Sequence, residues 1–289
     1  MSSQLSFANA HFGALNSRRL LIETLYAVKP FHEALTVIGA HAVHVWVQDA
    51  WGPVDMEATR DADLVLNPVF VAEDPKLIDM LNTIDIVPAL KDRPGIYGLR
   101  EEMDLSFGER TTIDFIVPEA YAGKGSRSAQ MQGQPKAAGR AAGLELALWD
   151  RHEVEIATID EPILTISTHV AGPAALLVSK AHKVSERFLE YQSHPDRLRP
   201  KDLGDIALLM MVSDPVECSE VINENIKLHP EIEEAVVSGA RYLMELFSSS
   251  SKDLMYNYAS ASLSARFEEE EVVDSINVWL DKFSTSRPV

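Results

Sequence analysis

The feature that most constrains the fold is a pair of apolar runs early in the chain, joined by a small-residue turn. The first run covers residues 36–38 and ends at Gly39-Ala40, and residues 41–50 then have helical character. The second run carries Asp61 and Asp63. Side chains at i and i+2 of a strand point to the same face. The sequence therefore predicts a strand–turn–helix–strand unit that presents two carboxylates side by side.

This carboxylate pair indicates a cation site. Two adjacent carboxylates repel each other unless a cation lies between them. Mg²⁺ accepts such hard oxygen ligands, usually one or two carboxylates together with substrate phosphates. A third carboxylate, Asp114, stands among apolar residues in a predicted strand over 111–117. A buried aspartate needs a partner, and a metal shared with Asp61 and Asp63 would be one. A solvated strand end is the simpler alternative for a lone Asp-x-Asp.

The length and patterning predict two domains. A chain of 289 residues exceeds one typical domain. Further strands are expected at 98–107, 154–159 and 163–168, whereas the pattern after residue 172 is helical. We expect an α/β (α+β) domain with a mixed sheet over residues 1–171, followed by a helical domain over residues 172–289.

Composition limits the compartment and the partners. The net charge of −18 argues against a protein that coats nucleic acid with its whole surface. Cys218 is the only cysteine, which excludes an internal disulfide. We find no apolar run near the roughly 20 residues of a membrane helix, and no signal peptide at the N-terminus. These features predict a cytoplasmic protein without a membrane partner.

One segment reverses the sign of the charge. Residues 121–143 are rich in Gly, Ser, Gln and Ala and lack acidic residues. Their basic side chains are Lys124, Arg127, Lys136 and Arg140. We interpret the segment as a mobile insertion, which is either a solvated loop without a role or an arm that clamps a polyanionic substrate.

The N-terminal motifs resemble those of the polymerase-beta-like nucleotidyltransferase superfamily. The segment Gly39–Val43 is similar to its Gly-Gly-x-Ala turn, and Thr59–Leu64 is similar to its Thr-x-Asp-hydrophobic-Asp strand. Asp114 corresponds to its later aspartate. The resemblance implies a nucleotidyltransferase-like N-terminal domain.

The C-terminal half narrows the resemblance to the AbiEii and MenT nucleotidyltransferase-like toxins. In these toxins a helical lysine precedes a Lys-Asp-x-x-Asp-Leu segment, and the chain has Lys180 followed by Lys201-Asp202-Leu203-Gly204-Asp205. The similarity covers roughly residues 30–212.

The resemblance implies transfer of a nucleoside monophosphate from an NTP to an acceptor hydroxyl, with Mg²⁺ or Mn²⁺. Asp61, Asp63 and Asp114 would be the catalytic metal ligands. Gly39, Ala40 and Lys180 would bind the NTP. Of these, Lys180 would be the cation that contacts the triphosphate. Asp202 would orient Lys180 or the acceptor hydroxyl.

By the same resemblance, tRNA is the favoured acceptor, the basic segment 121–143 would contact it, and the protein would be the toxin of a toxin–antitoxin pair. Other acceptors stay open: a cationic small molecule such as an antibiotic, which would suit an acidic protein, or a protein hydroxyl. A non-catalytic nucleotide-binding protein is the alternative outside the enzymes. We interpret His41 and His44 as ordinary helix histidines, because no Cys or third His lies at a matching spacing for zinc.

Overall fold

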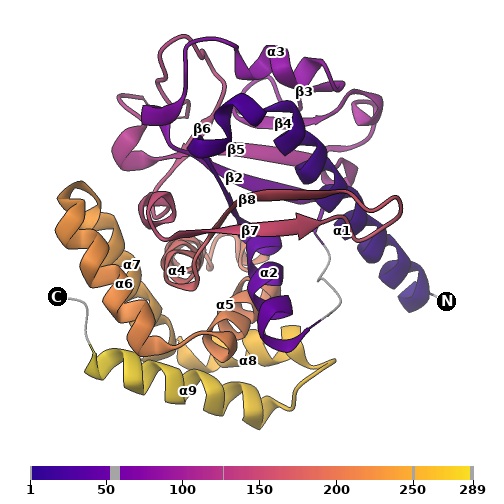
Figure 1. The fold of residues 1–289 in the computed structure, drawn as a ribbon. Helices are drawn as coiled ribbons and strands as arrows, with labels where there is room; N and C mark the ends of the chain where they lie inside the picture. The colour runs from indigo at the N-terminus through magenta and orange to yellow at the C-terminus, as the bar shows by residue number, and fades with distance from the viewer. Residues whose placement is uncertain (1, 53–58, 126, 249–250, 287–289) are drawn as a thin grey trace. The chain divides into compact units, whose positions relative to one another are not determined.

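The fold is built around the strand–turn–helix–strand segment that the sequence predicts. A computed structural model describes residues 2–52, 59–125, 127–248 and 251–286 (Figure 1). In it, β1 (Leu35–Ile38) leads into α2 (Gly39–Trp51), and β2 (Asp61–Leu66) follows as the antiparallel neighbour of β1. All four residues of β1 are buried, as expected for a strand inside a sheet.

The described residues form one eight-stranded sheet with the order β3-β4-β5-β2-β1-β8-β7, in which β6 pairs with β5. The pairs β1–β8, β2–β5 and β5–β6 are parallel, and the others are antiparallel. The remaining strands are β3 (Ile86–Pro88), β4 (Ile96–Leu99), β5 (Thr112–Pro118), β6 (Gly139–Ala141), β7 (Arg151–Ala157) and β8 (Thr165–Ala171).

Contacts divide the chain into two units. Unit 1 comprises Met1–Val45, Pro53–Ala141 and Arg151–Ala171; unit 2 comprises Trp46–Gly52, Ala142–Asp150 and Gly172–Val289. Unit 1 holds the sheet and unit 2 is mostly helical. The expected mixed sheet followed by a helical C-terminal part is confirmed at this level of detail.

Helix α1 (Ser2–Ala27) packs against β2, β5 and β8 of the sheet. Its buried Leu21, Ile22 and Leu25 recur at helical spacing. The helix ends before Lys29-Pro30, where a 3-10 helix, η1 (Lys29–Ala34), leads into β1. The short α3 (Leu77–Asn82) is the other α-helix that lies wholly in the described part of unit 1.

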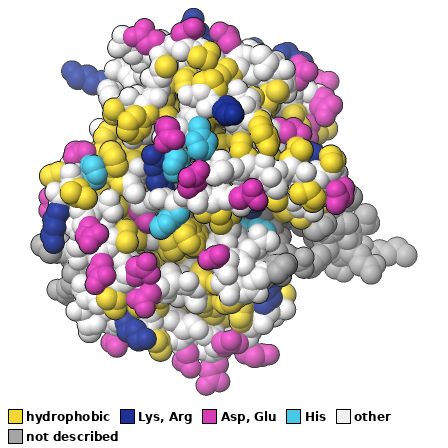
Figure 2. All heavy atoms as spheres, in the orientation of Figure 1, with side chains coloured by type: hydrophobic (Ala, Val, Ile, Leu, Met, Phe, Trp, Pro, Cys, Tyr) yellow, Lys and Arg dark blue, Asp and Glu magenta, His cyan; other side chains and the backbone are white. Residues whose placement is uncertain are grey.

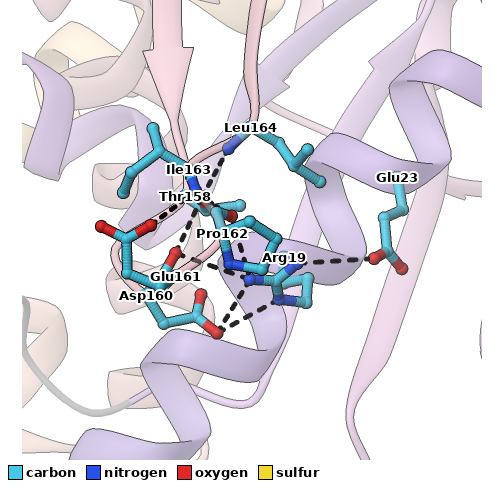
Figure 3. Close-up of polar contacts among 8 residues, drawn as sticks. All are labelled: Arg19, Glu23, Thr158, Asp160, Glu161, Pro162, Ile163 and Leu164. Atoms are coloured by element: carbon cyan, nitrogen blue, oxygen red, sulfur yellow. Dashed lines mark hydrogen bonds and ion pairs between the residues drawn. The ribbon is translucent and has the colours of Figure 1, made fainter.

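Arg19 ties α1 to the turn that joins β7 to β8 (Figure 3). Its Nε and Nη2 lie 3.2 and 3.0 Å from Asp160 Oδ2, and Nη2 also donates to the Pro162 carbonyl at 3.3 Å. Within the turn, the Thr158 hydroxyl accepts from the Leu164 amide at 2.9 Å. The planar guanidinium thus holds a carboxylate and a carbonyl of one turn at the same time.

The strand expected over 98–107 is wrong beyond Leu99. Residues Arg100–Glu102 and Phe107–Glu109 are 3-10 helices, and a capping box between Ser106 and Glu109 stabilises the second of them. The guanidinium of Arg110 donates to carbonyls of this loop. Side-chain hydrogen bonds to the loop backbone therefore replace the β ladder that a tight hairpin would have made.

The described part of segment 121–143 contributes a strand to the sheet and buries a polar side chain, whereas its composition predicts a loop throughout. The side chain of Gln134 is buried, and its Nε2 donates to the carbonyls of Ala72 and Pro75, both at 2.9 Å. Strand β6 lies in the same segment and pairs with β5. A buried amide with satisfied hydrogen bonds fixes a segment whose composition alone indicates a loop.

The helices of unit 2 pack on one another, with α4 against α5, α6 and α7, and α5 against α8 and α9. They are α4 (Pro173–Leu189), α5 (Pro200–Val212), α6 (Pro215–Leu228), α7 (Glu233–Ser248), α8 (Lys252–Leu263) and α9 (Glu269–Thr285). Proline occupies the first turn of α4, α5 and α6, where its missing N–H costs nothing. Among the described residues, no helix is both long and apolar enough to span a membrane.

Candidate functional site

The structure places two of the predicted metal ligands directly opposite each other. In the parallel pair β2–β5, Asp63 is the register partner of Asp114, and Asp61 is the partner of Thr112. Neighbouring strands lie about 4.8 Å apart. Asp61 lies two residues before Asp63 and shares its face of the sheet. The three predicted aspartates are therefore brought together at one end of two adjacent strands of unit 1.

Gly39 lies against this carboxylate group. The preceding residue, Ile38, is the register partner of Asp63 in the β1–β2 pair. Gly39 itself has a φ of +68°, which is a left-handed backbone conformation. A Cβ atom on Gly39 would lie 2.1 Å from Asp63 Oδ2. The turn therefore requires glycine for two reasons. It also sets the N-terminus of α2, where free N–H groups favour negative charge, next to Asp63.

Ala40 follows in the first turn of α2 and is half-buried. Its methyl group offers no polar atom, so a phosphate could meet only the backbone N–H at this position.

Asp61 is exposed and is held by the side chain of Thr59. The Thr59 hydroxyl lies within hydrogen-bonding distance of Asp61 Oδ1 and 3.2 Å from its carbonyl oxygen. The Thr59 carbonyl in turn accepts a hydrogen bond from the hydroxyl of Ser17 on α1, at 3.2 Å. The Asp-x-Asp strand is thus anchored to α1 just before its first aspartate.

Asp114 is the electrostatically strained member of the group. Its Oδ1 is buried and has no hydrogen-bond partner within the described part of the chain. Burial raises the pKa of Asp114 well above its ordinary value, and the negative charges of Asp63 and Asp61 raise it further. A divalent cation would supply the missing partner and offset the repulsion, so the donor set fits a hard metal ion.

Among the described residues, no three His, Cys, Asp or Glu side chains stand ready to hold a metal ion. The fit to a cation therefore rests on the Asp63–Asp114 register and on the unpartnered Oδ1, and the carboxylates would have to turn toward the ion.

Arg93 is a neighbour that the sequence did not indicate. It lies in the loop between β3 and β4, is exposed, and its positive charge lowers the pKa of Asp114. Its loop is fixed to β5 because the Phe115 amide donates to the Gly95 carbonyl at 2.8 Å. No local pattern reveals this proximity, which depends on pairing between β4 and β5.

Lys180 and Asp202 belong to unit 2. Lys180 on α4 forms a buried ion pair with Asp205 on α5, with Nζ 2.6 Å from Oδ2. Asp202 instead pairs with Lys183, at 3.0 Å, and with Arg187. Burial alone would raise the pKa of Asp202, but these two cations hold it below its ordinary value. Asp205 therefore orients the Lys180 ammonium, and the role of Asp202 stays a prediction.

His41 and His44 are buried on α2 and both accept hydrogen bonds from Arg18 of α1. Arg18 Nε lies 3.0 Å from His41 Nδ1, and its Nη2 lies 3.2 Å from His44 Nδ1. Burial lowers the pKa of Arg18 to about 10. Since a guanidinium has no acceptor atom, both Nδ1 atoms carry lone pairs here. This arrangement supports the interpretation of His41 and His44 as structural histidines.

The basic side chains of segment 121–143 divide into two groups. Arg140 is used inside the segment: it pairs with Glu119 at 2.9 Å and donates to the carbonyl of Gly123, also at 2.9 Å. Lys124, Arg127 and Lys136 are exposed.

Comparison with known proteins finds no family model, no curated protein and no solved structure that this chain matches.

Proposed function

We propose that this chain is a nucleotidyltransferase that uses Mg²⁺ or Mn²⁺ and moves a nucleoside monophosphate from an NTP to an acceptor hydroxyl. The observation that carries the proposal is the register of Asp63 opposite Asp114, together with the buried, unpartnered Oδ1 of Asp114. The order β1, Gly39 turn, α2, β2 and β5 also agrees with the order of motifs in the polymerase-beta-like superfamily.

In this proposal, Asp61, Asp63 and Asp114 hold the divalent ion. The chemistry that the bound ion supplies is a lowered pKa of the attacking hydroxyl and neutralisation of charge on the leaving pyrophosphate. The glycine at position 39 leaves room for the Asp63 carboxylate beside the first turn of α2, whose N–H groups favour a phosphate. The Thr59 hydroxyl, which donates to Asp61 Oδ1, fixes the direction of the Asp61 carboxylate. Such transfer depends mainly on positioning and charge neutralisation.

The Lys180 ammonium forms a buried ion pair with Asp205. Its role as the cation on the triphosphate remains an expectation from the resemblance to the AbiEii and MenT toxins.

We further propose tRNA as the acceptor, in a toxin that a cognate antitoxin would control. The support is three exposed basic residues, Lys124, Arg127 and Lys136, in a stretch of the sequence without acidic residues; an RNA backbone would bind such side chains.

The test is transfer of label from each of the four α-labelled NTPs into total tRNA in the presence of Mg²⁺. Wild type would be compared with Asp63→Asn and with Asp79→Asn, which removes an exposed carboxylate of α3 as a matched control. We expect label with wild type and Asp79→Asn only. Equal transfer by Asp63→Asn, or an absence of NTP binding, would contradict the proposal. NTP binding without label in tRNA would move the acceptor to a small molecule or a protein hydroxyl.

A further inference from the structure

A chain of buried polar side chains runs through unit 1 to the proposed metal site. Its members are Ser17 and Arg18 on α1, His41 on α2, and Thr59, which precedes β2. The first three are no more than 2% exposed, and Thr59 is 7% exposed. Figure 2 shows histidine side chains at the surface beside acidic and basic ones, whereas His41 is buried. Buried polar groups are costly unless they are hydrogen-bonded, so the bonds of these side chains decide how they are placed.

Arg18 sets the direction of the hydrogen bonds along this chain. A guanidinium only donates, and Arg18 Nε lies 3.0 Å from His41 Nδ1, so Nδ1 accepts. In the neutral imidazole the proton is then on Nε2, which lies 3.1 Å from Ser17 Oγ and donates to it. The Ser17 proton is shared between two backbone carbonyls, those of Thr59 and Ala14, each 3.2 Å from Oγ. The donors therefore follow one consistent order from Arg18 to the Thr59 carbonyl.

Thr59 connects this chain to the first aspartate of the site. Its carbonyl accepts from Ser17, and its hydroxyl donates to Asp61 Oδ1. Helix α1 can approach Thr59 this closely because Gly13 has no side chain: a Cβ there would lie only 3.2 Å from the Thr59 carbonyl oxygen. The direction of the Asp61 carboxylate therefore depends on where α1 holds Thr59.

We propose that Arg18, His41 and Ser17 are positioning residues that orient Asp61 for the divalent ion. The inference rests on the proposed function, and it adds residues of α1 that no motif in the sequence connects with the site. Asp61 is exposed, so its carboxylate would lose rotamer freedom on binding an ion. A hydroxyl that already holds the carboxylate reduces this cost, as outer hydrogen-bond partners of metal ligands do.

The first test measures Mn²⁺ binding by electron paramagnetic resonance in the presence of NTP. Ser17→Ala removes the link between His41 and the Thr59 carbonyl and creates no bulk. Ser219→Ala is the matched control, because Ser219 is a buried helix serine of unit 2 whose hydroxyl also donates to a distant carbonyl, that of Ser286 at 2.8 Å. We expect similar losses of stability in urea for both variants, but Mn²⁺ affinity at least about tenfold weaker in Ser17→Ala only.

A second measurement needs neither the ion nor NTP. NMR of the isotope-labelled imidazole nitrogens of wild type reports which ring nitrogen of His41 carries the proton. We expect a bare Nδ1 and a protonated Nε2, because only this tautomer accepts from Arg18 and donates to Ser17. A neutral ring with its proton on Nδ1 would break the order of donors and overturn the inference.

The outcomes of the Mn²⁺ titration separate the positioning role from the proposed function. Binding by wild type but not by Asp63→Asn would support the metal site. Equal Mn²⁺ affinities of Ser17→Ala and Ser219→Ala would then overturn the positioning role alone. If wild type binds no Mn²⁺ in the presence of NTP, the proposed function and the positioning role are both overturned.

Discussion

Gly39 is a residue of the proposed site that no larger residue can replace without strain. Its φ of +68° disfavours any side chain, and a Cβ would lie 2.1 Å from Asp63 Oδ2. Gly52 provides a matched comparison, because it has a φ of +77° but nothing within 4 Å of the position of a Cβ. We expect Gly52→Ala to cost about 1–2 kcal/mol from backbone strain alone.

Gly39→Ala should cost roughly 3 kcal/mol, since overpacking adds about 1–3 kcal/mol to the same strain. It should also abolish nucleotidyl transfer, because the Asp63 carboxylate must move. Urea unfolding and the transfer assay would be run on both variants. Equal losses of stability in the two variants would refute the argument from space at Gly39.

We expect the Asp114 carboxylate to lower the free energy of unfolding of the metal-free protein at neutral pH. Because its folded pKa lies above its ordinary value, the folded state binds the more protons above pH ~4, and stability falls as the pH rises through the folded pKa. We expect Asp114→Asn to raise the free energy of unfolding at pH 7 by about 1 kcal/mol, the order of the cost of one unsatisfied buried polar group.

The measurement is urea unfolding without divalent metals over a range of pH. The stability gain of Asp114→Asn over wild type should shrink toward zero as the pH is lowered to about 4, and transfer activity should be lost at every pH. A gain that is independent of pH would exclude ionisation of Asp114 as its cause.

Among single residues, the sequence predicts those site residues whose neighbours in the sequence already indicate their role. The i, i+2 spacing of Asp61 and Asp63 is visible in the strand, and so is the small-residue turn before α2. Arg93 was missed because it approaches Asp114 only through the pairing of β4 with β5. The Asp205 partner of Lys180 was also missed, since both aspartates of α5 lie on one helix face and spacing does not choose between them.

At the scale of elements, the Lys180–Asp205 pair joins α4 to α5 inside unit 2, and both side chains are less than 10% exposed. Removing one member leaves a buried charge, so Lys180→Met should cost about 3–5 kcal/mol. The double variant Lys180→Met/Asp205→Leu should recover most of that loss. Lys183→Ala, which breaks the more exposed pair with Asp202, should cost no more than about 1 kcal/mol.

Thermal and urea unfolding of these variants would measure the pair. The folded double variant also tests the expected role of Lys180 without a folding defect, because it lacks the ammonium. If Lys180 contacts the triphosphate, transfer is lost even though the protein is stable. Full activity of the double variant would confine Lys180 to a structural role.

Elements were predictable where periodicity was long and unbroken. Strand β2 has the predicted bounds, and α2 differs from its predicted range only at the ends. The strand expected over 98–107 was wrong beyond Leu99, because side-chain bonds from Ser106 and Arg110 end an element that hydrophobic patterning would continue. The helical pattern expected after residue 172 is confirmed by α4 to α9.

At the scale of the whole molecule, the net charge of −18 repels an RNA substrate, whereas the exposed basic residues Lys124, Arg127 and Lys136 attract it. We expect the triple variant Lys124→Ala/Arg127→Ala/Lys136→Ala to weaken tRNA binding and to reduce its log–log salt dependence by about 2–3, near 0.7–0.9 per lost phosphate contact. NTP binding should not change.

The control for that experiment removes the same charge elsewhere. Lys227, Lys252 and Lys282 are exposed residues of unit 2, so their triple alanine variant has the same net charge. Filter binding of tRNA over a range of salt concentrations would compare the two variants. Equal losses would show that net charge, and not the position of Lys124, Arg127 and Lys136, governs binding.

The central claim is that Asp61, Asp63 and Asp114 hold a divalent ion together with a nucleoside triphosphate. The most direct measurement is electron paramagnetic resonance of Mn²⁺ titrated with the protein, with and without NTP, for wild type, Asp63→Asn and the surface control Asp79→Asn. We predict that wild type and Asp79→Asn bind Mn²⁺ more tightly when NTP is present, and that Asp63→Asn loses this binding although it remains folded. Binding of Mn²⁺ and NTP by Asp63→Asn at wild-type strength would contradict the claim.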